Sequence, residues 1–82
     1  MNELGTGLLK VLESSSLGRM SVYVITKQSH DLGIDLDTIS PVEAGRLVSK
    51  LGNVLPFFLA DETNEVITNM KRFVNNGNMV MT

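Results

Sequence analysis

The stretch from residue 40 to residue 59, SPVEAGRLVSKLGNVLPFFL, contains the strongest helix signal in the chain and also a proline that should interrupt a helix. Ser40 can cap the first turn, Pro41 fits the first helical position, and Glu43 can reach back to the Ser40 amide. These residues predict a helix that begins at Pro41.

Pro56 lies inside the same stretch, and the apolar pattern continues across it. At about 100° per residue, six apolar side chains lie within about 60° of Leu51, namely Ala44, Leu47, Val48, Val54, Leu55 and Phe58. We therefore expect one helix from Pro41 to about Leu59, kinked at Pro56, where the proline costs roughly 3 kcal/mol. The alternative ends a helix at Leu51 and starts another at Pro56, which leaves the continuous phase unexplained.

Apolar residues at helical spacing predict two further helices, one from about Thr6 to Ser14 and one from Glu62 to about Val74. Gly5 and Gly7 should fray the start of the first. The expected buried face of the last helix consists of Thr63, Val66, Ile67, Met70, Phe73 and Val74. The sequence NNGN, residues 75–78, should end that helix and leave residues 75–82 as a flexible tail.

Residues 19–32 are compatible with two structures. The run SVYVITK, residues 21–27, is rich in β-branched residues and would suit a buried strand. We favour a helix, because Gly33 and the apolar Ile34 form a helix stop and SSSLG, residues 14–18, offers side chains to cap its start. Its apolar residues surround the helix, which is typical of a buried helix. It should be the central helix or an oligomer contact.

These segments together predict an all-α protein, a compact bundle of about four helices. The 82 residues leave little room for a second core, so we expect a single helical domain over residues 1–74. Domains of this size are marginally stable, and many gain stability by association.

Composition excludes several classes of function. The chain has no cysteine, so it has no disulfide or thiolate metal site, which suits a cytoplasmic location. It also lacks an apolar run of the roughly 18 residues that a membrane span needs. Seven basic and nine acidic residues, spread along the chain, give a net charge of -2 and no basic stripe. We expect neither a membrane nor nucleic acid as a partner.

Chemically reactive groups are sparse. His30 beside Asp31 could form a general base with its orienting carboxylate, but a surface histidine at a helix C-terminus explains it as well. Asp31, Asp35 and Asp37 could suit calcium, yet the twelfth position from Asp31 is Val42 rather than the required glutamate. We predict no metal, no cofactor and no catalytic residue, and therefore no enzyme.

One group of small residues is a candidate interface. Gly45, Ser49 and Gly52 lie on one flank of the third helix, where they would let another backbone approach closely. The approaching helix could belong to a partner or to the same chain, and the sequence favours neither. Phe57, on the opposite flank, is a candidate exposed anchor for a partner.

The stretch SLGRMSVYVITKQSHDLGIDLDTISPVEAGRLVSKLG, residues 16–52, contains an LG helix start, a KQ…LGI helix end and an SP restart. The residues that carry this pattern are Leu17, Gly18, Lys27, Gln28, Leu32, Gly33, Ile34, Ser40 and Pro41. In this pattern the chain resembles small all-helical domains of uncharacterised prokaryotic proteins. The resemblance implies a helical fold and no activity, substrate or cofactor, and Pro56 lies outside it.

Three functions fit these observations. The first is a non-catalytic module that binds another protein or forms a homodimer. The second is a small DNA-binding transcriptional regulator that uses Arg46 and Lys50, four residues apart on the polar side of the third helix. The third is a pocket for a small molecule or lipid between the helices.

Overall fold

The described part of the chain folds into five α-helices, four of which are longer than ten residues. The computed structural model describes the backbone of residues 1–80 and the side chains of residues 1–75. The helices are α1 Glu3–Glu13, α2 Met20–Asp31, α3 Pro41–Val54, α4 Pro56–Leu59 and α5 Glu62–Val80. The described backbone contains no strand, so the predicted all-α bundle is confirmed.

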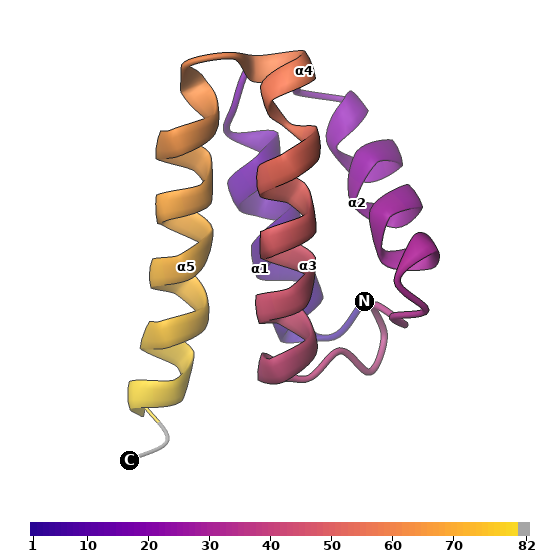
Figure 1. Ribbon diagram of the computed structural model, residues 1–82. Helices are drawn as coiled ribbons and strands as arrows, with labels where there is room; N and C mark the ends of the chain where they lie inside the picture. The colour runs from indigo at the N-terminus through magenta and orange to yellow at the C-terminus, as the bar shows by residue number, and fades with distance from the viewer. Residues whose placement is uncertain (81–82) are drawn as a thin grey trace.

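Helix α3 lies at the centre of the bundle (Figure 1). It contacts each of the other four helices, with α5 along one side, α2 along the other and α1 behind it. Helix α2 contacts α1 and α3, and among the described helices it contacts no other. The short α4 lies at the end of the bundle where α5 begins, and α2 starts toward the same end (Figure 1).

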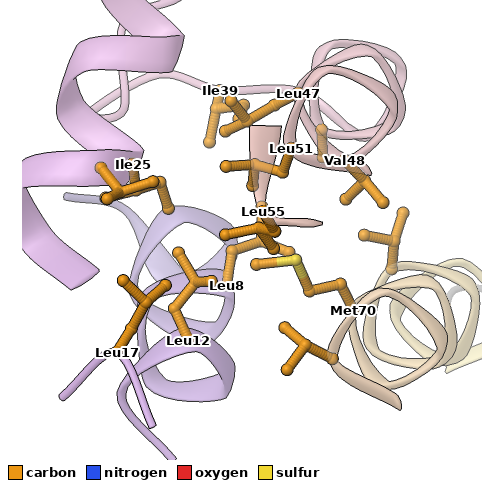
Figure 2. Packing of buried hydrophobic residues seen from close by; sticks show 14 of the residues in the cluster. Leu8, Leu12, Leu17, Ile25, Ile39, Leu47, Val48, Leu51, Leu55 and Met70 are labelled. Atoms are coloured by element: carbon orange, nitrogen blue, oxygen red, sulfur yellow. The ribbon is translucent and has the colours of Figure 1, made fainter. Parts of the chain in front are cut away.

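Leucines of α1 and α3 form the middle of the core (Figure 2). The buried face of α3 and its continuation consists of Ala44, Leu47, Val48, Leu51 and Leu55, all of which the sequence predicts. Val54, predicted for the same face, is half-buried. On α5, Thr63, Val66, Met70 and Val74 are buried while Ile67 and Phe73 are half-buried against them, which confirms the predicted face. Helices α3 and α5 therefore bury the sides that their periodicity indicates.

The predicted caps at the two ends of the α2–α3 connector are present. The Glu43 amide donates to Ser40 Oγ at 3.2 Å, and the Ser40 amide donates to Glu43 Oε1 at 3.0 Å. At the end of α2, the Ile34 amide donates to the Ser29 carbonyl at 2.8 Å, around Gly33 at φ +70°. This left-handed stop ends a helix, so the strand alternative for residues 19–32 is excluded.

The start of α2 differs from the prediction. No side chain caps it, and the chain enters through Gly18 at φ +52°. Ser15 Oγ instead accepts a hydrogen bond from the Leu17 amide at 3.2 Å inside the preceding turn. The serines therefore shape the connection from α1 rather than cap α2.

Pro56 interrupts the helix locally, as expected. Leu55, between α3 and α4, has helical dihedrals, φ -59° and ψ -31°. The Leu55 amide donates to the Leu51 carbonyl at 2.8 Å, and the Leu59 amide donates to the Leu55 carbonyl at 2.8 Å. The path stays helical through the kink and leaves it at Ala60, at φ 48°. One expectation fails beyond the kink, because Phe58 has an exposed fraction of 54% rather than lying in the core.

The first and last helices, α1 and α5, are longer than predicted. α1 starts at Glu3 because the Asn2 side chain accepts a hydrogen bond from the Gly5 amide at 2.9 Å and donates one to the Ile39 carbonyl at 3.0 Å. α5 continues past the predicted end near Val74, since one glycine weakens a helix by only about 1 kcal/mol. The expectation of a flexible tail falls mostly on residues 76–82, outside the described side chains.

Candidate functional site

The predicted small-residue interface lies partly against α5 and partly in solvent. A Cβ placed on Gly52 would contact Ile67 Cδ1 at 4.0 Å, an ordinary packing distance. A Cβ on Gly45 would meet nothing within 4 Å, and Ser49 is exposed. The three residues do not form a close helix crossing within the described chain. Their contact with a partner stays a prediction.

The close-packing glycines are in α1 instead. A Cβ on Gly7 would overlap the ring of Phe73, and a Cβ on Gly5 would lie 2.8 Å from the Leu36 carbonyl oxygen. Because Gly7 has no side chain, α5 can seat an aromatic ring directly on the α1 backbone. The sequence indicates fraying at these glycines. Their role in close packing could have been predicted from their position within the apolar pattern of α1, close to Leu4 and Leu8.

Helix α2 does not occupy the centre, contrary to one expectation for it. Val22 has an exposed fraction of 46% and Tyr23 of 65%, and Met20 is also exposed. Ser21, between them, is fully buried, and its Oγ has no hydrogen-bond partner among the described residues. The helix therefore buries a polar side chain and presents apolar ones to solvent.

An open hollow of about 580 Å³ runs along the exposed side of α2. We call its lining the outer face of α2, and it consists of Arg19, Val22, Tyr23, Thr26, Lys27, His30 and Asp31. The volume alone would suit a small molecule. All of the lining comes from one helix and its N-cap residue, however, so a small ligand would be contacted from one side only.

Charges on the outer face of α2 are mostly basic. Lys27 Nζ lies 3.5 Å from Asp31 Oδ2, an exposed pair four residues apart. Arg19 forms no ion pair within the described residues. His30 is exposed, and Asp31 pairs with Lys27 rather than with His30 among the described residues.

A second exposed apolar group lies at the turn between α4 and α5. Phe57 has an exposed fraction of 87%, and Phe58 precedes the turn. Asp61 and Glu65 follow it in the sequence and are exposed, Glu65 in the first turn of α5. We call these four residues the α4 corner. The sequence predicts the exposure of Phe57 correctly, whereas its prediction that Phe58 lies on the apolar face is wrong.

The neighbouring Glu62 has a structural role. Its carboxylate accepts a hydrogen bond from the Ser16 amide at 3.1 Å and so holds the α1–α2 connection against the start of α5. This contact spans 46 residues. Glu62 is therefore not counted in the α4 corner.

The residues of the other predicted sites are dispersed. Arg46 is exposed and Lys50 is half-buried on α3. Asp35 Oδ1 accepts a hydrogen bond from the Asp37 amide at 2.8 Å, which closes a local turn in the connector. Among the described residues, no three His, Cys, Asp or Glu side chains form a group that could hold a metal ion. Within the same part of the chain, no helix has the length and apolar character to cross a membrane.

Comparison with known proteins assigns no family to this chain, because no family model, no curated protein and no solved structure matches it. Function therefore has to be inferred from the fold and its surfaces.

Proposed function

We propose that this chain is a non-catalytic, cytoplasmic module that associates with further copies of itself through the outer face of α2. One observation carries the proposal, the placement of Val22 and Tyr23 in solvent while Ser21 is buried on the same helix. The cytoplasmic location rests on the lack of cysteine, since such a chain gains nothing from an oxidising compartment.

Burial of the outer face of α2 against another copy would remove from water apolar area that the fold of the single chain leaves exposed. Exposed apolar area costs roughly 25 cal/mol for each Å² left in water. Val22 and Tyr23 are adjacent and contribute to a single surface. Tyrosine is also enriched among residues that dominate binding energy at interfaces. An unpartnered helix side of this kind fits a protein contact better than an enclosed ligand.

DNA binding is the alternative class, and it has weaker support. Its candidate residues, Arg46 and Lys50, are two cations on a chain of net charge -2. Proteins that bind duplex DNA neutralise several phosphates, so their affinity falls steeply with salt. Salt-dependent binding to duplex DNA would favour this alternative.

The substitution Tyr23→Asp tests the proposed function. Light scattering on the wild-type chain, over about 10 µM to 1 mM, should show a mass that rises with concentration. Tyr23→Asp places a charge at the middle of the outer face, where it would be desolvated on contact, so the variant should stay monomeric. Tyr23 is mostly exposed, so its helical circular dichroism should match that of the wild type.

Thr68→Asp is the matched control, because Thr68 is exposed on α5 and gains the same charge. It should associate as the wild type does. A wild-type chain that remains monomeric over the whole range would overturn the proposed function, as would a Tyr23→Asp variant that associates normally.

A further inference from the structure

The two exposed apolar groups carry opposite charge. The outer face of α2 carries two cations, Arg19 and Lys27, and one acid, Asp31, which pairs with Lys27. The α4 corner carries two acids, Asp61 and Glu65, and no basic residue. With His30 neutral, two cations and one acid give the outer face of α2 a net charge of +1, and two acids give the α4 corner a net charge of -2.

This charge pattern disfavours pairing of like surfaces. Two α2 faces in contact would bring together two surfaces of net positive charge, and two α4 corners would bring Asp61 and Glu65 of each copy together. Like charges juxtaposed at an interface cost several kcal/mol. Pairing of an α2 face with an α4 corner instead places cations beside carboxylates around an apolar centre.

We propose that the α4 corner of one copy docks on the outer face of α2 of the next copy, an inference that rests on the proposed self-association. Phe57, the most exposed aromatic side chain of the described residues, would enter the hollow beside Val22 and Tyr23. Asp61 and Glu65 would lie toward Arg19. The one-walled hollow thereby gains its second wall from another molecule.

The two surfaces cannot meet within one molecule. Helices α2 and α4 are not in contact among the described elements, and both are fixed to the core, through residues such as Ile25 and Leu59. The contact is therefore between copies and joins unlike surfaces. Such head-to-tail contacts continue from copy to copy unless they close a ring. The wild-type mass should accordingly exceed that of a dimer at high concentration.

The deciding experiment mixes two variants, each with one surface blocked. Phe57→Asp blocks the α4 corner and leaves the α2 face intact, whereas Tyr23→Asp does the reverse. Each variant alone should be monomeric by light scattering, and an equimolar mixture should give a 1:1 pair that grows no further. The affinity of the pair should fall as the salt concentration is raised, because salt screens the attraction between exposed charges, with a screening length of about 10 Å at 0.1 M. The neutral variant Phe57→Ser, which should lose association too, separates loss of the ring from the added charge.

The outcomes distinguish this inference from the proposed function. If Tyr23→Asp blocks association while Phe57→Asp and Phe57→Ser associate normally, the docking inference is wrong and self-association through α2 stands. If both blocked variants are monomeric and their mixture is also monomeric, an intact α2 face does not bind an intact α4 corner, which again overturns the docking inference. A monomeric wild-type chain overturns both proposals.

Discussion

Helices α2 and α3 lie side by side and are equally apolar, but they bury different kinds of residue. Five of the twelve residues of α2 and six of the fourteen residues of α3 are hydrophobic. Every buried residue of α3 is apolar. Three of the five buried residues of α2 are polar, namely Ser21, Gln28 and Ser29. Since the apolar content is the same, the difference lies in where the hydrophobic residues point.

The comparison separates the residues that hold the fold from those available for contact. Helix α3 contacts all the other helices and places its leucines among them. Helix α2 packs against two helices, and its buried residues are Val24, Ile25 and the three polar residues named above. The stability of the monomer does not explain why Val22 and Tyr23 are apolar, since both are exposed. We propose that they contact another copy.

The largest expected change in the free energy of unfolding tests whether buried residues of α3, and not exposed residues of α2, stabilise the fold. Leu51→Ala empties a fully buried position and should lower the free energy of unfolding by about 3 kcal/mol. Val22→Ala removes exposed methyl groups and should change it by less than about 0.5 kcal/mol. Urea unfolding, followed by circular dichroism at a concentration where the chain is monomeric, measures both. A comparable loss in the two variants would mean that the outer face of α2 supports the fold.

A second pair of substitutions tests how open the outer side of α3 is. Gly45→Ala adds a methyl group in free space and should stabilise the helix by about 1 kcal/mol. Gly7→Ala forces the Phe73 ring away from α1 and should destabilise the protein by about 2 kcal/mol. Thermal unfolding of both variants gives the signs. If Gly45→Ala were destabilising, the small-residue flank would be in contact with something.

The smallest effect concerns the polar residues buried by α2. Ser21→Ala removes a buried hydroxyl that has no partner in the described chain and should raise the free energy of unfolding by about 1 kcal/mol. Ser29→Ala removes a hydroxyl that donates to the Ile25 carbonyl at 2.8 Å, so it should give no such gain. Chemical unfolding at equal concentrations compares the two. Equal effects would show that helix propensity, rather than the unpaired hydroxyl, decides the result.

Local signals in the sequence predict much of the fold because they act within a few residues. The capping residues Ser40 and Glu43, the stop at Gly33, and the kink at Pro56 all depend on near neighbours. The start of α1 also depends on a local signal, because the Asn2 side chain accepts a hydrogen bond from the Gly5 amide three residues away, but the prediction begins α1 too late and misses this cap. The second contact of that side chain, with the Ile39 carbonyl across 37 residues, cannot be identified before the fold is known.

The candidate site is less predictable for the same reason. The exposure of Phe57 follows from a helical wheel, since it lies opposite the expected contact flank. The burial of Ser21 and the exposure of Tyr23 do not follow, because residues in α2 are apolar on nearly every side. Which side is buried depends on how α1 and α3 present their surfaces. Phe58 shows a related limit, because α4 buries Leu59 rather than Phe58, so the apolar phase of α3 does not continue past Pro56.

The position of α2 at the side of the bundle also has a kinetic consequence. Opening of α2 would break its packing against α1 and α3 and leave α3 packed against α5. Amide hydrogens in α2 should therefore exchange with solvent through a local opening that leaves the rest of the molecule closed. A copy bound to the outer face would oppose the opening of α2, so assembly should slow hydrogen exchange in this helix.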